Sequence, residues 1–424
     1  MSQFIVKRQF KSLLATGVCA AVACFVITLI YWPLWGAAAK AIISWGAGEG
    51  LAAVEPKVAA KYFSCFAEAT FFWFVINAWI WHTLIFGLYG KTSVTERQPG
   101  AGIFYSLVGV LSGLAGFLLI VGFLGIWWKP FSFGILFTPQ TASDVQLAIE
   151  GWEASNFFAL TVIMVQIPFV SLLQKWPFAG NIKAPWDGFG VWTMSMLAAV
   201  IVWMGAIVPS FMKLSIGAHE ITSVPHGSFP TFVAFCQGFI WCLLIPAEGG
   251  ETYPMKFFAK KQPWMGLCGF VLALLVGFGL RALLRPVVTS LNLLPGAPID
   301  LVIASLILSG VVAMLMWHHL FDDFPTPQMV PNQAARILSR FCIWVVLGAV
   351  LGVAWIKTFK MLPFGASDLG LGFPTMGILA GQFAFLMAFL YFNTFFDKWP
   401  LVRKVPMTVV QQQQQPKKKA ASGR

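Results

Sequence analysis

The sequence predicts an all-α integral membrane protein, a polytopic helix bundle of about ten transmembrane helices with the N-terminus and the C-terminus in the cytoplasm. Two observations support this fold class. Of the 424 residues, 58% are hydrophobic and only 10% are charged, whereas an ordinary soluble domain carries about 25% charged residues. The apolar residues also gather in ten long runs. Runs of about 20 residues are needed for helices to cross the hydrocarbon layer with every backbone N–H and C=O bonded internally.

In chain order, the ten runs cover residues 12–36, 62–89, 102–128, 154–174, 189–212, 229–249, 263–284, 299–320, 337–358 and 371–396. The first run is too long for a signal peptide and lacks a small-residue cleavage site, so it predicts a retained helix. Residues 1–404 therefore form a single transmembrane helical domain. The basic, Gln-rich segment 405–424 has too little apolar content to fold, and it predicts a disordered cytoplasmic tail.

The distribution of basic residues gives the orientation, because cytoplasmic loops carry the excess of Lys and Arg. With the N-terminus inside, nineteen of the 28 Lys and Arg residues fall in cytoplasmic segments, seven of them at the C-terminal end. The net charge of +12 is then explained by topology and by contact with anionic lipid, and not by nucleic acid. The expected location is a bacterial-type inner membrane, with the lipid bilayer as the main partner.

The cysteines and the loops narrow the function classes. All seven cysteines lie within the predicted spans and none forms a CxxC pair, so we expect small core residues and neither a disulfide framework nor structural zinc. The loops are too short for a soluble catalytic domain. No nucleotide-binding glycine motif, catalytic triad order or paired Asp-rich motif is present. Enzymatic chemistry is therefore unsupported.

Short sequence matches suggest a repeat of two-helix hairpins. "QKWP" at 174–177, "DDFP" at 322–325 and "DKWP" at 397–400 are spaced by 148 and 75 residues, close to two units and one unit of a common period. One interpretation is five hairpins repeated head to tail. Two alternatives stay open: the common use of Trp, Lys and Pro at helix ends near headgroups, and a five-plus-five inverted repeat typical of secondary transporters.

Glu68 is the first candidate functional residue, because a carboxylate inside a membrane span is costly and usually faces the bundle interior. It is followed by His82 in the same run. Fourteen residues at 100° each end about 40° short of four turns, so we expect both side chains on one face, about 21 Å apart. Glu68 is predicted to couple protons or to bind a cation; the alternative is a hydrogen bond that fixes helix packing.

Uncharged polar residues within the spans are candidates for the path of a solute. The three are Gln166, Gln237 and Gln382. Their ordinary role is hydrogen bonding between helices, and lining a path is the functional alternative.

The stretch "MLMWHHLFDDFP" places His318, His319 and Asp322 at the end of an apolar run. Together with His82, these histidines suggest two hypotheses: axial ligation of a b-type haem, or a proton relay to Asp322. The alternative that we favour is anchoring and capping at a helix C-terminus. We therefore expect no cofactor, with haem b as the alternative.

The loop residues His219, Glu220 and His226 are a weak metal candidate. Two imidazoles and a carboxylate suit a divalent ion, but their spacing is not the HExxH spacing that places both histidines on one helix face. We expect solvated loop groups and no metal.

The sequence thus favours a multi-pass permease that moves a small-molecule solute, coupled to protons or ions through Glu68. The first alternative is an integral membrane subunit of a redox or oxygenase complex that binds haem, quinone or metal through helix histidines. The 41 Phe, 19 Trp and 6 Tyr suit a flat apolar ligand, although they also pack cores. The second alternative is a scaffold that assembles other membrane proteins. Subunits of a membrane complex or further copies of this chain are the expected protein partners.

Overall fold

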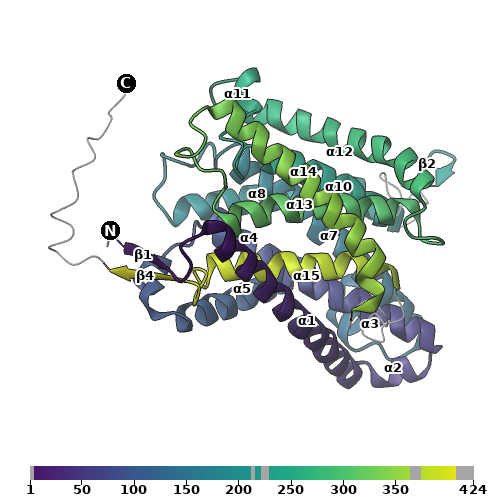
Figure 1. Ribbon diagram of the computed structural model, residues 1–424. Helices are drawn as coiled ribbons and strands as arrows, with labels where there is room; N and C mark the ends of the chain where they lie inside the picture. Colours follow the sequence, from purple (N-terminus) through teal and green to yellow (C-terminus); the bar gives the residue numbers. More distant parts are fainter. Residues whose placement is uncertain (1–3, 212–214, 221–228, 363–373, 407–424) are drawn as a thin grey trace.

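The computed structural model describes residues 4–211, 215–220, 229–362 and 374–406. Within them the chain is mostly helical (Figure 1). Eight of the described helices are long and apolar enough to cross a membrane. They are α1 (Leu13–Gly46), the continuous span Pro56–Ile85, α5 (Gly100–Gly125), α7 (Ala142–Ser171), α8 (Trp186–Ala206), α12 (Trp264–Leu291), α13 (Ile299–Phe321) and α14 (Gln333–Thr358), which continues to Met361.

Each of the ten predicted runs overlaps at least one helix in the described part of the chain. The two remaining helices, α10 (Phe229–Leu244) and α15 (Pro374–Thr394), are apolar but shorter, so ten spans stay a prediction. The span Pro56–Ile85 joins α3 (Pro56–Phe71), η1 (Phe72–Asn77), α4 (Ala78–Ile80) and η2 (Trp81–Ile85). The short elements are α2 (Gly48–Ala52), η3 (Lys91–Ser93), η4 (Thr95–Arg97), η5 (Lys129–Phe131), α6 (Phe133–Phe137), α9 (Val208–Phe211), α11 (Met255–Phe258) and η6 (Phe359–Met361).

The helices divide into buried and exposed sets. In the most apolar window of the span Pro56–Ile85, α7 and α13, between 72% and 89% of the residues are buried; in α1, α5, α8, α12 and α14 the share is 17% to 33%. The side chains of α10 and α15 that are described are also mostly buried. We call the span Pro56–Ile85, α7, α10, α13 and α15 the inner ring. The apolar outward faces of the other five helices suit contact with lipid.

The inner ring closes on itself, and each inner helix is paired with one outer helix. Successive inner helices are in contact along the chain order. The last helix, α15, returns to the first span because Tyr391 Oη donates to the carbonyl of Val75 and Trp79 Nε1 donates to Thr394 Oγ1. The outer helix α5 packs on η1, α8 on α7, α12 on α10, α14 on α13 and α1 on α15.

Small residues allow the outer helices to approach the ring closely. A Cβ added at Gly348 of α14 would lie 2.7 Å from the Cα of Gly310 in α13, and one at Gly113 of α5 would lie 2.6 Å from the carbonyl oxygen of Trp73. Backbone-to-backbone contact of this kind is typical of helix association in membranes, where packing replaces the hydrophobic effect as the driving force.

The five inner helices all end in the same backbone conformation. Two consecutive residues with positive φ follow each of them: Gly87–Leu88, Gln174–Lys175, Glu251–Thr252, Asp322–Asp323 and Asp397–Lys398. Polar contacts join these turns around one end of the ring. Lys175 Nζ donates to the carbonyl of Ile85, Lys398 pairs with Asp322, and Lys91 pairs with Asp397. The carboxyl ends of the five inner helices therefore gather at one end of the bundle, which we call the turn end.

A short antiparallel ribbon joins the two ends of the described chain. β1 (Phe4–Arg8) pairs with β4 (Val402–Pro406), with Val6 opposite Lys404, and the two strands lie side by side in Figure 1. The ribbon places the start of α1 and the end of α15 on the same side of the bundle; which side is cytoplasmic stays a prediction. β4 reaches two residues into the segment assigned to the tail, and 407–424 lie outside the described residues. A second ribbon pairs β2 (Ser215–Ile216) with β3 (His219–Glu220).

Glu251 gives the turn end a dependence on pH. Its carboxylate accepts hydrogen bonds from Arg336 Nε and Nη2 at 2.7 and 2.8 Å and from Gln333 Nε2 at 2.7 Å. Partial burial raises the pKa of Glu251, but the hydrogen bonds from Arg336 and Gln333 and the charges of Arg336 and Arg340 outweigh it and hold that pKa below its usual value. A carboxyl group whose folded-state pKa is lowered stabilises the fold above the unfolded-state pKa, and that contribution is lost as the pH falls through the folded-state pKa.

We therefore expect the thermal unfolding midpoint in detergent to fall between about pH 6 and about pH 3, and to fall less in Glu251→Gln than in the wild type. Glu49→Gln is the matched control, because Glu49 is an exposed carboxylate in α2. A pH dependence that is identical in wild type and Glu251→Gln would contradict the prediction.

Candidate functional site

A cavity lies on the axis of the inner ring. Its volume is about 60 Å³, enough for several water molecules. All five inner helices contribute to its wall, which is mostly apolar. The lining residues include Trp79 of the first span, Ile163 of α7, Gln237 of α10, Leu315 of α13 and Phe383 of α15. Two of its lining residues are polar, Gln237 and Glu248, and Glu248 lies just beyond the end of α10.

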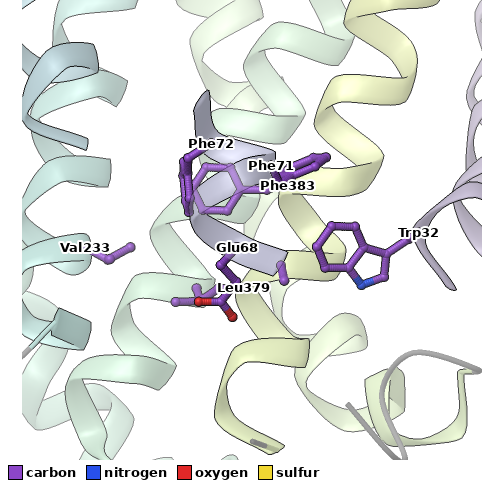
Figure 2. A pocket seen from close by; sticks show the side chains of 8 residues that line it. Trp32, Glu68, Phe71, Phe72, Val233, Leu379 and Phe383 are labelled. Carbon is purple, nitrogen blue, oxygen red and sulfur yellow. The ribbon is translucent and has the colours of Figure 1, made fainter. Parts of the chain in front are cut away.

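A second, smaller cavity of about 10 Å³ holds Glu68. Its wall consists of Trp32, Glu68, Phe71, Phe72, Val233, Leu379, Ala380 and Phe383, and Figure 2 shows the Glu68 side chain close to Leu379. Glu68 is 6% exposed, so the structure places a buried carboxylate inside the bundle. Phe383 lines both cavities, and its ring packs edge-on against Phe72 at a centroid distance of 5.2 Å. Phe383 is therefore the partition between the Glu68 cavity and the axial cavity.

The expectation that Glu68 and His82 share one face is wrong. η1 and η2 are π-helical, with bonds such as Phe86 N to Trp81 O that span five residues. π-Helical turns contain more residues than α-helical turns, so the rotation per residue falls below 100° and the faces drift apart. Glu68 faces the inner ring, whereas His82 Nε2 lies 2.7 Å from Ser112 Oγ of the outer helix α5.

Of the three glutamines, only Gln237 lines the axial cavity. Its Nε2 is buried and has no hydrogen-bond partner among the described residues. Gln166 accepts a hydrogen bond from Trp81 Nε1 at 2.8 Å. Gln382 links α15 to α13 because it accepts from Ser305 Oγ and donates to Ser309 Oγ. Gln166 and Gln382 thus hold helices together, the ordinary role of such residues in spans.

Glu248, His318 and His319 form a compact cluster at the turn end. His318 Nε2 lies 3.2 Å from Glu248 Oε2, and His319 Nε2 lies 4.0 Å from the same oxygen. One ligand atom from each of the three residues lies within 4.8 Å of the other two. Sequence reasoning missed Glu248 as a candidate. Glu248 is a carboxylate at the end of the apolar run 229–249, and this position in the sequence could have identified it as a candidate.

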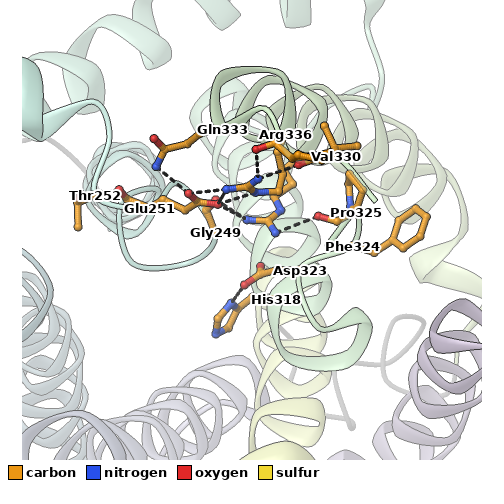
Figure 3. Close-up of polar contacts among 12 residues, drawn as sticks. Gly249, Glu251, Thr252, His318, Asp323, Phe324, Pro325, Val330, Gln333 and Arg336 are labelled. Carbon is orange, nitrogen blue, oxygen red and sulfur yellow. Dashed lines mark hydrogen bonds and ion pairs between the residues drawn. The ribbon is translucent and has the colours of Figure 1, made fainter. Parts of the chain in front are cut away.

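The turns after α10 and α13 bring the cluster together. Gly249 has φ +100°, and a Cβ there would lie 2.7 Å from Asp323 Oδ1, so the close approach of the two turns requires glycine. Arg340 holds both turns, because its Nη1 donates to the carbonyl of Gly249 and its Nη2 donates to the carbonyl of Pro325. Figure 3 shows Asp323 beneath these contacts, bonded to His318 Nδ1 at 2.9 Å.

Asp322 is not the partner of the histidines, which corrects the proposed relay to that residue. Its carboxylate pairs with Arg8 at 3.1 Å and with Lys398, so it ties the β1–β4 ribbon to the end of α13. Asp323 bonds His318 instead, because consecutive residues with left-handed backbone point their side chains in different directions. The structure brings His318 and His319 together with Glu248; the contacts of His82 are with α5, on another side of its helix.

The three loop residues proposed as a weak metal site are only partly described. His219 is exposed on β3, Glu220 follows it in the same strand, and His226 lies outside the described residues. Their arrangement as ligands therefore stays a prediction.

Comparison with known proteins names no relative: no family model matches the chain, and neither a curated protein nor a solved structure is significantly similar to it.

Proposed function

We propose that the protein is a multi-pass permease whose path runs along the axis of the inner ring. The observation that supports this most directly is the axial cavity, because residues from all five inner helices line it and Phe383 separates it from a second cavity that holds Glu68. Buried carboxylates thus border the two successive cavities, Glu68 in the smaller and Glu248 in the larger. Ionisable groups at such positions are the usual elements of ion and proton paths.

The proposal includes a repeat of five two-helix hairpins. The recurrence of two positive-φ residues after every inner helix favours head-to-tail units over an inverted repeat. The fifth pair, α15 with α1, is joined by the β1–β4 ribbon in place of a covalent turn. Such a repeat directs five helix C-termini to one end of the path, and their dipoles favour a cation there. The solute is therefore a cation, or a small molecule that moves with protons, and the bacterial inner membrane remains the proposed location.

Glu68 is the proposed coupling residue. The test is a flux measurement on the full-length protein in liposomes that contain a pH-sensitive dye, with a potassium gradient and valinomycin to drive protons. We expect Glu68→Gln to lower the proton flux by about a hundredfold, the lower end of what a positioned proton-transfer group contributes. Glu55→Gln is the matched control, because Glu55 is exposed at the start of the same helix.

Retained proton flux in a folded Glu68→Gln protein would remove Glu68 from the coupling role. Absence of flux in the wild type would favour the alternatives. One of these, a redox or oxygenase subunit, is supported by the imidazole and carboxylate cluster at the end of an apolar cavity. A reduced-minus-oxidised absorption spectrum of the purified protein tests it for haem. A scaffold protein would have neither flux nor a bound ligand.

A further inference from the structure

The cluster at the turn end contains polar atoms that lack partners. Glu248 is 8% exposed, and its Oε2 is buried without a hydrogen bond from any described residue. His319 Nε2 is also buried and has no hydrogen-bond partner among the described residues. His318 Nε2 is at ion-pair distance from Glu248 Oε2 but not in hydrogen-bond geometry. Since buried polar groups normally have a partner in protein, water or an ion, these atoms are available to bind one.

The other ring nitrogen of each histidine is held from outside the cluster. His318 Nδ1 bonds Asp323 Oδ2 at 2.9 Å, which places a proton on Nδ1, so the neutral ring keeps its lone pair on Nε2. His319 Nδ1 lies 2.7 Å from Asn393 Nδ2. A half-turn of this amide would present its oxygen to Nδ1–H, and the ligand role of His319 requires that orientation because it leaves the lone pair on Nε2. Histidines that ligate metals are almost always oriented in this way by a carboxylate or an amide-type oxygen.

The charges and distances also suit a divalent ion. With neutral imidazoles, Glu248 and Asp323 bring two negative charges, while the nearby Lys398 is already paired with Asp322. The nitrogen-to-oxygen separations of 3.2 and 4.0 Å lie on either side of the roughly 3.4 Å between two ligands that are each about 2.1 Å from a tetrahedral ion. All three ligand atoms lie within 4.8 Å of one another, so side-chain rotations would have to bring them to a common ion.

We propose that Glu248, His318 and His319 bind one divalent first-row transition-metal ion. Two histidines and one carboxylate are the ligand set used for Zn²⁺ and for non-haem Fe²⁺. Asp323 and Asn393 are positioning residues that orient the two rings. Glu248 also lines the axial cavity, so one side of the ion faces that space.

A third cavity lies at the turn end, next to the chain segment that carries Glu248. This cavity of about 340 Å³ is lined by Gln174, Thr252, Pro246 and Ala247. Pro246 and Ala247 directly precede Glu248, so the chain segment that carries the proposed ligand separates this cavity from the axial cavity.

The test is calorimetric titration with Zn²⁺ of the full-length protein, purified in mild detergent with a histidine-free tag and stripped with chelator. We expect one Zn²⁺ per chain. Glu248→Gln, His318→Ala and His319→Ala should each weaken binding by more than the roughly 10–100-fold expected for Asp323→Asn, which removes only a positioning group. His82→Ala and His219→Ala are matched controls that should leave the affinity unchanged.

A second measurement keeps the proposal testable if a cluster variant does not fold. On the wild-type protein, Zn²⁺ should protect His318 from labelling by diethyl pyrocarbonate, read by mass spectrometry, and should leave exposed His219 labelled. Absence of stoichiometric binding, binding lost only in His219→Ala, or no protection of His318 would overturn the proposal. The inference does not depend on permeation, since Glu68→Gln should bind Zn²⁺ as the wild type does whatever its flux.

Discussion

Asp397→Asn is expected to destabilise the fold by about 3–5 kcal/mol, the cost of leaving one buried charge without its partner. The side chains of Lys91 and Asp397 are each 6% exposed, and Lys91 Nζ lies 2.6 Å from Asp397 Oδ1. Burial lowers the pKa of Lys91, and the hydrogen bond and charge of Asp397 offset only part of that effect. Asp397 also accepts from Gln98 Nε2 at 3.0 Å, so the variant disturbs several contacts between the first and last turns.

The measurement is equilibrium unfolding in mixed detergent micelles, followed by circular dichroism. Glu153→Gln is the control, because Glu153 and Lys61 form a pair whose side chains are 39% and 35% exposed, and such pairs contribute about 1 kcal/mol or less. The double variant Lys91→Met with Asp397→Asn should recover much of the loss, because it leaves no buried charge without its partner and Asn tolerates the positive φ of this position. Equal stability of Asp397→Asn and Glu153→Gln would contradict the prediction.

Phe383→Ala is expected to join the Glu68 cavity to the axial cavity and to raise passive proton flux through the protein. Phe383 is 7% exposed and lines both spaces. Removing its ring leaves a space that water can enter, because Glu68 supplies a polar partner on one side and Gln237 supplies one on the other. The same substitution should cost about 3–5 kcal/mol of stability through lost packing.

Phe389→Ala separates the two effects. Phe389 lies on the same helix, is fully buried and packs against Phe385, but it lines neither cavity. We expect it to lose similar stability without a rise in proton flux in dye-loaded liposomes. If the two variants leak equally, Phe383 is not a partition and the increase reflects loosened packing alone.

Sequence reasoning located the helices well but their faces less well. Each apolar run overlaps a helix because length and composition decide whether a segment can enter a bilayer. The shared face of Glu68 and His82 was wrong because apolar composition does not distinguish π-helical from α-helical turns, and the π-helical stretches depend on packing within the ring. Asp323 was passed over for Asp322 because only the backbone conformation of the turn decides which of two adjacent aspartates faces the histidines.

The sequence by itself determined that the chain is a helical protein of membrane composition. It also marked Glu68, Gln237 and the two adjacent histidines, because a charged or polar residue within an apolar run can be recognised without knowing the fold. Only the tertiary structure decided that five helices form a closed ring with a cavity on its axis, and that Glu248 meets His318 and His319. These contacts join residues about 70 positions apart, and they depend on turn conformation and on glycine contacts such as Gly249 against Asp323. Patterns of neighbouring residues in the sequence do not show which residues far apart in the chain come into contact.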